Sequence, residues 1–264
     1  MEGRTKIETN EQKPQSLTRE GAWSRLLGVV VSPRATFESI GRKPSWLLPV
    51  LLIVFVNVAA TYSQQRRGGL LTAPQRVGLE QQLKSSPALS HMTQQQRGQK
   101  LHETRSLDNR VITGAAYFGV LLGTPLVVLI IAAVLLGAFN LVFRAGVKYG
   151  QSLAVTSYAL IPFLVNSLIS LALIWVRPPG TVPAQSMFVA SLAPFLPSHA
   201  PLWLVGLARS LNAFDLWTLG LLAVGYAAVS LKKVQFGKAL ALVLSLWGVY
   251  LFAMVGLSVA AARP

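Results

Sequence analysis

The chain has 264 residues, of which 52% are hydrophobic and 12% are charged. An average soluble domain is roughly 25% charged, so this composition indicates a protein that is surrounded mostly by lipid. The formal net charge of +15 would suit nucleic acid, but the cations lie in the connections between apolar runs and no nucleic-acid-binding motif accompanies them. We therefore expect the charge to face anionic lipid headgroups and expect no nucleic-acid partner.

Residues that could carry chemistry are scarce. Cysteine is absent, which excludes disulfides, thiol catalysis and cysteine-ligated metals. The histidines, His91, His102 and His199, have no partner at a metal-binding spacing, and the apolar runs hold no nucleophile with a base. The sequence therefore predicts no catalytic residue, no metal and no cofactor.

The N-terminal region divides into two parts. Residues 1–16 are polar and have no apolar period, which predicts a disordered cytoplasmic tail. Residues 17–45 mix apolar side chains with arginines, which is typical of amphipathic helices in a headgroup layer, with a break at Pro33. A helix packed on the cytoplasmic end of a membrane bundle explains the same residues equally well.

Apolar runs in the remainder, residues 46–263, predict membrane-spanning helices, because each approaches or exceeds the roughly 20 residues that cross a bilayer. The fold class is therefore all-α, a polytopic membrane helix bundle with five transmembrane helices and an amphipathic N-terminal region. The predicted spans are 46–63, 113–143, 151–176, 214–231 and 238–261.

The two long connections have different characters. Thr93 and Gln96 have capping-box spacing, which predicts one helix from about 93 to 143 that protrudes into the extracytoplasmic loop 64–110. Segment 186–211 is apolar but holds several prolines, which favours an interfacial or re-entrant segment over a sixth span.

Cations in the short loops set the orientation. They place the N-terminus and both short loops in the cytoplasm and the C-terminus outside. Arg66 and Arg67, beside the first span, oppose this rule, but loop 64–110 is long and long loops count less. The cytoplasmic cations are Arg144, Lys148, Lys232, Lys233 and Lys238.

An elbow joins the second and third spans. Arg144 and Lys148 should hold it at the cytoplasmic surface, and Gly146 and Gly150 should allow the tight reversal. Gln151 and Ser152 should begin the returning helix.

Pro162 should kink the third span and free a backbone carbonyl. The hydroxyl of Ser157 or Tyr158 is the expected donor to that carbonyl.

Asp215 is the only carboxylate within the predicted spans. It could bind an ion or proton, but a place in the first turn of a helix, as a cap, with Arg177 and Arg209 as partners, is the stronger interpretation.

Two further patterns concern the bundle itself. Gly119 and Gly123 form a GxxxG spacing, for which packing inside the monomer is favoured over dimerisation. Trp46, Trp175 and Trp217 lie near predicted span ends, as an aromatic belt requires.

Several motifs in order resemble the YIP family (Ypt-interacting, Yip-one domain) of five-span membrane proteins, and more closely its bacterial branch. They are "SPRATFESIGRKPSWLLPVLL", "GVKYGQSLAVTSYALIP" and "FDLWTLGLLAVGYAAVSLKKVQFGKAL". The resemblance implies five helices, a cytoplasmic N-terminus and an extracytoplasmic C-terminus. Eukaryotic members are associated with Rab-type GTPases and vesicle traffic, a pattern from which loop 64–110 departs. The candidate site residues are Pro33, Phe37, Gly146, Lys148, Tyr158, Pro162, Asp215 and Trp217.

We therefore expect a non-enzymatic scaffold or partner-binding protein, integral to a bacterial cytoplasmic membrane. Its partners would be the bilayer and an unknown membrane or cytoplasmic protein, and a homo-oligomer stays open. The alternative is a transporter or channel for an ion, a small molecule or a lipid, with a pathway past the Pro162 kink and Asp215.

Overall fold

The computed structural model describes residues 21–67, 110–176 except 112, 211–261 except 232 and 233, and isolated positions from 192 to 208. The predicted tail, most of loop 64–110, most of segment 186–211 and the histidines lie outside the described residues. Within them the chain is nearly all helical, as predicted. The elements are α1 (Ala22–Val31), α2 (Pro33–Arg42), α3 (Leu47–Arg67), η1 (Gly119–Gly123), α7 (Thr124–Phe143), α8 (Tyr149–Ala159), α9 (Ile161–Val176), α11 (Ala213–Val229) and α12 (Phe236–Ala261).

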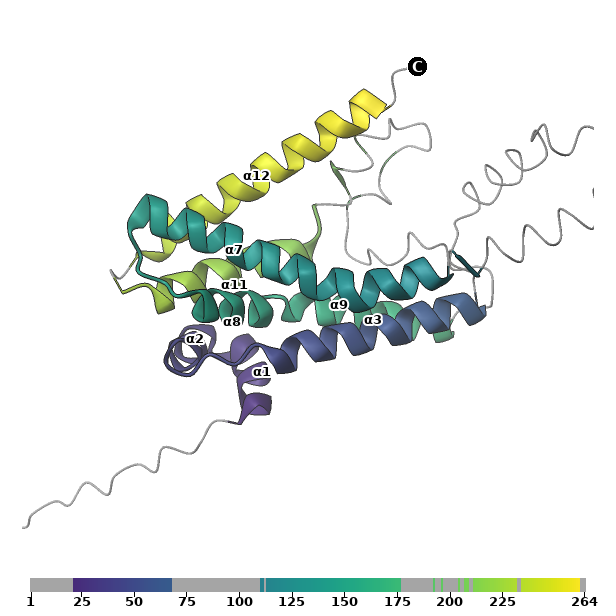
Figure 1. The fold of residues 1–264 in the computed structure, drawn as a ribbon, viewed down its shortest axis with the longest axis horizontal. Coiled ribbons are helices and arrows are strands. Elements are labelled where there is room, and N and C mark those ends of the chain that lie inside the picture. The colour runs from purple at the N-terminus through teal and green to yellow at the C-terminus, as the bar shows by residue number, and fades with distance from the viewer. Residues whose placement is uncertain are drawn as a thin grey trace, which may run out of the picture.

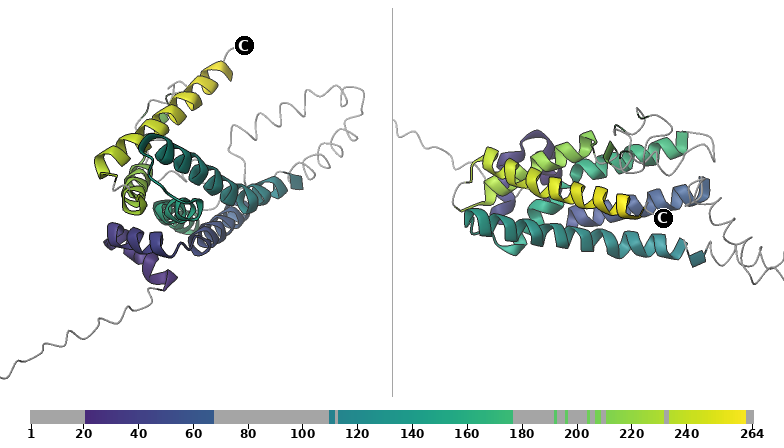
Figure 2. Two further views of the ribbon diagram at one scale, coloured as in Figure 1. Left: turned by 60° about the vertical axis from the view of Figure 1, so that its left-hand side comes forward. Right: turned by 90° about the horizontal axis from the view of Figure 1, so that it is seen from above.

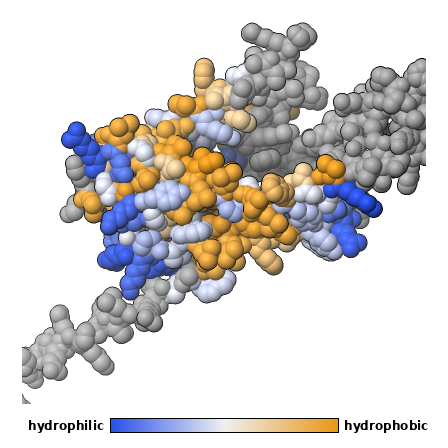
Figure 3. Space-filling model, viewed as in Figure 1, coloured by the Kyte–Doolittle hydropathy of each residue, from blue (hydrophilic) through white to orange (hydrophobic). Residues whose placement is uncertain are grey.

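Four helical stretches are long and apolar enough to cross a membrane: Leu47–Arg66, Thr113–Phe143, Tyr149–Val176 and Phe236–Gly256. The fifth, α11, is apolar but has 17 residues, or about 25 Å at 1.5 Å per residue. Apolar side chains form a band across the molecule, with hydrophilic residues at both ends (Figure 3). The chain is thus an integral membrane helix bundle, roughly consistent with the five predicted spans.

The long helices run side by side along the molecule (Figure 1). The helix pairs α3 with α9 and α7 with α8 pack together, and α11 packs against α2, α8 and α12. Toward the C-terminus α12 diverges from the bundle in both Figure 1 and the left view of Figure 2.

The core is built around α8, whose residues from Ser152 to Ala159 are all buried. Beside it, the ring of Phe139 from α7 stacks on that of Tyr226 from α11, with centroids 4.3 Å apart. The side chain of Phe252, on α12, is by contrast 83% exposed. An exposed apolar side chain on a spanning helix faces lipid. The helices α8 and α11 therefore form the interior of the bundle, and α12 lies at its periphery.

The N-terminal region forms two short helices, α1 and α2. They meet at Ser32, and Pro33 begins α2, so the predicted break is confirmed. Phe37 and Ile40 of α2 are fully buried in the contact with α11 and α8, whereas Leu27 of α1 is 73% exposed. The expected helix packed on the end of the bundle therefore describes α2. The exposed apolar side chains of α1 match the other expectation, an amphipathic helix in the headgroup layer.

Gly225 allows the close approach of α2, α8 and α11. A Cβ atom added there would lie 2.5 Å from Val155 Cγ1 and 3.1 Å from Phe37 Cδ1, whereas one added at Gly220, on the same helix, would meet nothing within 4 Å. Other helices thus press against α11 at Gly225, whereas its surface at Gly220 is open.

We expect Gly225→Ala to lower the free energy of unfolding in detergent by about 1–3 kcal/mol, because an extra methyl group overpacks this contact. The matched variant, Gly220→Ala, should leave it unchanged or raise it by up to about 1 kcal/mol through helix propensity. Equal destabilisation by both variants would contradict the packing described here.

Gly119 and Gly123 lie in η1, a π-helical turn with no buried residue. The turn has a local cause: Pro125 lacks an N–H, and its ring clashes with the carbonyl of Leu121. A Cβ atom added at either glycine would meet nothing within 4 Å among the described residues. The helix α3 contacts η1, but no described atom lies close to either glycine, so packing of these glycines inside the monomer stays a prediction.

Candidate functional site

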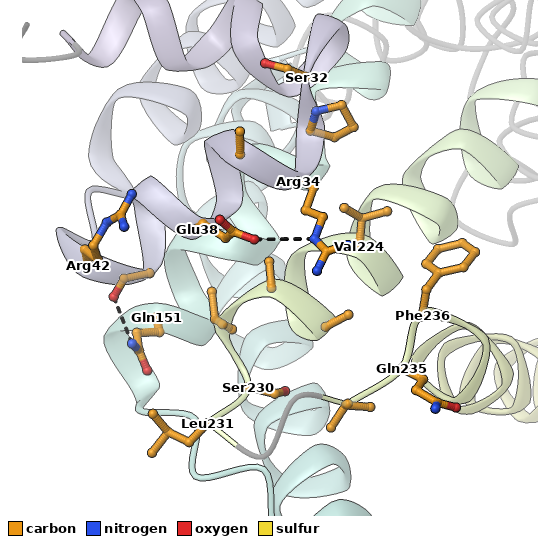
Figure 4. A pocket seen from close by; sticks show the side chains of 17 residues that line it. Ser32, Arg34, Glu38, Arg42, Gln151, Val224, Ser230, Leu231, Gln235 and Phe236 are labelled. Atoms are coloured by element: carbon orange, nitrogen blue, oxygen red, sulfur yellow. Dashed lines mark hydrogen bonds and ion pairs between the residues drawn. The ribbon is translucent and has the colours of Figure 1, made fainter. Parts of the chain in front are cut away.

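A groove of about 1370 Å³ opens at the end of the bundle that carries the elbow (Figure 4). It lies between α2, the C-terminal half of α11 and the connection from α11 to α12. Its apolar lining consists mainly of small or branched side chains of α11 and the start of α12. These are Val224, Ala227, Ala228, Val229, Leu231, Val234 and Phe236.

The rim of the groove on α2 is basic. Arg34 pairs with Glu38 at 3.4 Å, and the two side chains are 85% and 46% exposed, so the pair contributes little to stability. Arg42 also lines the groove, and no carboxylate lies within 4 Å of it among the described residues. The rim thus carries more positive than negative charge beside an apolar floor.

Gln151 joins α2 to the start of α8. Its Nε2 donates to the carbonyl of Gly41 at 2.9 Å, and its Oε1 accepts from the N–H of Lys148 at 3.0 Å. The helix begins at Tyr149, two residues before the predicted start, and Gln151 lies in its first turn, where it caps the backbone of Lys148. The bond to α2 joins residues far apart in the sequence, and no local pattern predicted it.

The elbow reverses through Arg144 and Gly146, with φ angles of 48° and 68°. The prediction for Gly146 is confirmed, but that for Gly150 is wrong, because the reversal is complete before α8 begins and Gly150 lies inside the helix. A Cβ atom at Gly146 would also lie 2.8 Å from Leu231 Cδ1. The positive φ favours glycine there, whereas the exposed Leu231 side chain can move to admit a Cβ atom.

Asn140, which no sequence pattern indicated, closes the elbow. Its Nδ2 donates to the carbonyl of Val147, and its Oδ1 accepts from the N–H of the same residue, both at 3.0 Å. The carbonyl of Ala145 accepts from the N–H of Leu231 at 3.0 Å. The elbow is thus tied to α7 on one side and to the groove-lining connection on the other.

Tyr158 is fully buried, and its hydroxyl lies 3.4 Å from Ser45 Oγ, in the link between α2 and α3. Ser45 Oγ also accepts from Arg25 Nη1 at 3.1 Å. These contacts connect α1, the link and α8 in a polar chain near the end of the bundle.

The helix is interrupted at Leu160, between α8 and α9, two residues before the predicted kink at Pro162. The expected donors do not reach the carbonyl that Pro162 frees. Ser157 Oγ donates instead to the carbonyl of Leu153 at 2.6 Å, one turn earlier, and Tyr158 points to Ser45. The prediction of a side-chain partner for that carbonyl is therefore wrong.

Asp215 lies in the first turn of α11, at the end of the helix away from the groove. Asn212 is the N-cap: its Oδ1 accepts from the N–H of Asp215 at 2.9 Å, and its Nδ2 donates to the Asp215 carboxylate. The placement of Asp215 in the first turn is confirmed, but the cap is Asn212 and not Asp215, which is hydrogen-bonded to the cap. The expected partners Arg177 and Arg209 lie outside the described residues.

The candidate residues do not form one site. Pro33 lines the groove, Phe37, Gly146 and Lys148 support its walls from α2 and the elbow, and Trp217 lies with Asp215 at the other end of α11. The floor of the groove was missed, because Ala227 and Ala228 look like any span residue in the sequence.

Within the described part of the chain, no three His, Asp or Glu side chains gather to hold a metal ion.

Comparison with known proteins adds one finding. The family model of the Yip1 domain matches residues 27–257, which includes α2, the elbow and the whole groove. No curated protein and no solved structure matches the chain.

Proposed function

Because the chain belongs to the Yip1 domain family, a family of integral membrane proteins, we propose that it is a non-enzymatic scaffold that binds a protein partner in the groove. The observation that carries this proposal is an apolar floor beside a basic rim, at one end of a membrane bundle. The volume of about 1370 Å³ exceeds the roughly 300–1,000 Å³ of small-molecule pockets, which favours a segment of polypeptide.

The occupant that fits is an amphipathic segment with acidic side chains, from a cytoplasmic or membrane protein. Its apolar face would cover Val224 and Ala228, and its carboxylates would pair with Arg42, whose charge has no carboxylate partner among the described residues. Charge complementarity of this kind favours encounter with acidic partners and disfavours basic ones.

We place the groove on the cytoplasmic side of a bacterial cytoplasmic membrane, with the C-terminus outside. The support is that Arg42, Lys43, Arg144 and Lys148 gather near the groove end, and cations in short loops favour the cytoplasm. An impermeant thiol reagent should then label Ala35→Cys, at the groove rim, only from the cytoplasmic side.

Transport past the Pro162 kink and Asp215 has less support. Asp215 is hydrogen-bonded to the N-cap Asn212, and capping of this kind stabilises a helix. This structural role explains the carboxylate at the start of α11, so no bound ion is needed to explain it.

A photo-crosslinking side chain at position 228 tests the proposal in native membranes. We expect it to capture one protein of defined mass, and Arg42→Glu to reduce the capture about tenfold, as a loss of roughly 1.4 kcal/mol in binding requires. The charge-reversal control is Arg66→Glu, at the far end of α3, which should leave the capture unchanged.

The same side chain at position 252, on the exposed face of α12, controls for nonspecific capture. Equal capture from positions 228 and 252, or equal effects of the two charge reversals, would overturn the groove as the partner-binding site.

A further inference from the structure

We propose that the exposed apolar face of α1 docks in the interfacial layer of the bilayer without the help of anionic lipid, and that a rigid corner between α1 and α2 makes this docking brace α2. The surface concerned lies outside the groove, because no residue of α1 lines the groove. The docking needs no partner in the groove, so it stands or fails separately from the partner-binding function.

One side of α1 is apolar and open. Its exposed apolar residues recur at helical spacing, whereas Arg25 and Val29, on the opposite side, are buried against the protein. An open apolar face of this kind is the pattern of a helix that lies in a headgroup layer, and tryptophan is enriched at that level of a membrane. The exposed apolar residues are Trp23 (65%), Leu27 (73%), Val30 (46%) and Val31 (83%).

The exposed face of α1 carries no charge. Arg25 is the one charged residue of α1, and its buried side chain points inward, where Nη1 donates to the carbonyl of Lys43 at 2.9 Å. In many interfacial helices, lysines and arginines on the polar face add attraction to anionic lipid. Docking of α1 therefore comes from the removal of apolar surface from water, which does not depend on headgroup charge.

The helix α1 lies at the level where the chain enters the membrane. Arg25 Nη1 also donates to Ser45 Oγ at 3.1 Å, and the spanning helix α3 begins shortly afterwards, at Leu47. Leu47 is 55% exposed and faces lipid at the start of that helix. In Figure 1, α1 runs across the direction of α3 and α7, as a helix in the plane of the bilayer surface does. The bilayer is therefore the occupant that fits its apolar face.

The helices α1 and α2 form a rigid corner at Ser32. The N–H of Ser32 donates to the carbonyl of Gly28 at 2.7 Å, and its carbonyl accepts from Thr36 Oγ1 at 3.0 Å. A Cβ atom added at Gly28 would lie 2.5 Å from Thr36 Oγ1, so the two helices touch there. The bond from Arg25 to Lys43 ties α1 to the C-cap of α2. These contacts make α1 and α2 move as one unit.

The corner transmits the docking of α1 to the wall of the groove. Phe37 and Ile40 hold α2 in the core of the bundle, and other residues of α2 form the rim of the groove. When α2 detaches, the corner also pulls the apolar face of α1 out of the bilayer and into water, which is unfavourable. Docking of α1 thus adds to the stability of α2 in its place.

Fluorescence quenching in reconstituted vesicles tests the docking. The chain has no cysteine, so single cysteines at Leu27, Ala35 and Phe55 can each carry a fluorophore in the full chain. With phospholipid brominated near the headgroup, we expect strong quenching at position 27 and weak quenching at position 35, because an interfacial helix sits about 5–10 Å into the boundary of headgroups and acyl chains. With bromine near the chain ends, position 55, within the spanning helix α3, should be quenched most.

Lipid composition tests the driving force. Quenching at position 27 should be the same in phosphatidylcholine vesicles with and without phosphatidylglycerol. Quenching that appears only with phosphatidylglycerol would overturn docking by apolar contact alone. Equal quenching at positions 27 and 35, or none at 27, would overturn the bilayer as the occupant of this face.

Hydrogen exchange of α2 in the same vesicles tests the brace. Leu27→Glu places a charge in the docked face, so we expect the amides of α2 to exchange about tenfold faster, a loss of roughly 1.4 kcal/mol in the free energy of local opening. The matched control is Leu141→Glu, which places the same charge at an 84% exposed position of α7 and should leave α2 unchanged. Unchanged exchange in Leu27→Glu, or equal acceleration in both variants, would overturn the brace.

Discussion

Replacement of Phe37 by alanine is expected to lower the free energy of unfolding by about 3–5 kcal/mol, the usual cost of removing a large side chain from a packed interior. Phe37 is fully buried, and its ring packs against the backbone of Gly225, which has no side chain. Its loss leaves a cavity between α2 and α11, which form two walls of the groove, so α2 should also detach more readily.

The control for Phe37→Ala is Phe252→Ala. Phe252 lies on α12 and is 83% exposed, so its removal loses contacts with detergent or lipid and not with the protein. Reversible unfolding of both variants in the same detergent would measure the difference. If Phe252→Ala costs as much as Phe37→Ala, α2 is not docked as described.

Replacement of Tyr226 by alanine is expected to cost a similar amount, about 3–5 kcal/mol. The ring is fully buried and stacks on Phe139. Its hydroxyl forms a hydrogen bond with Ser152, and Ser152 Oγ donates to the carbonyl of Ala132 at 2.6 Å. The residue thus joins α7, α8 and α11 by both packing and polar contacts.

Tyr226→Phe separates these two contributions. It keeps the stacked ring and removes the hydroxyl, so the expected loss is about 0.5–1.5 kcal/mol, typical of one hydrogen bond. Tyr250→Ala, at a 55% exposed position of α12, controls for loss of the side chain alone. A loss in Tyr226→Phe as large as that in Tyr226→Ala would show that the hydroxyl network, and not the stacked ring, dominates.

The sequence by itself determined that this is a membrane helix bundle and where most of its helices begin and end. Apolar runs of spanning length are a property of composition, and the breaks at Ser32 and near Pro162 follow from the missing N–H and fixed φ of proline. The preference of acidic side chains for the start of a helix likewise placed Asp215 in the first turn. Features of this kind depend only on neighbouring residues, and neighbours are visible in one sequence.

Hydropathy could not decide which apolar residues face protein and which face lipid, because lipid tails are as apolar as a packed interior. Phe37 and Phe252 look alike in the sequence, yet one is buried and the other exposed. The same holds for Gly225, which is crowded, and Gly119, which is open. Spacing alone did not single out Gly225, where the described helices approach most closely.

Only the tertiary structure decided which polar groups meet. Gln151 binds the backbone of Gly41, and Arg25 reaches Ser45 while its Nε finds no partner among the described residues. The groove likewise exists because α2 packs against the C-terminal half of α11. Such pairs are separated by many residues, and their contacts depend on helix packing in three dimensions, which no local pattern of the sequence encodes.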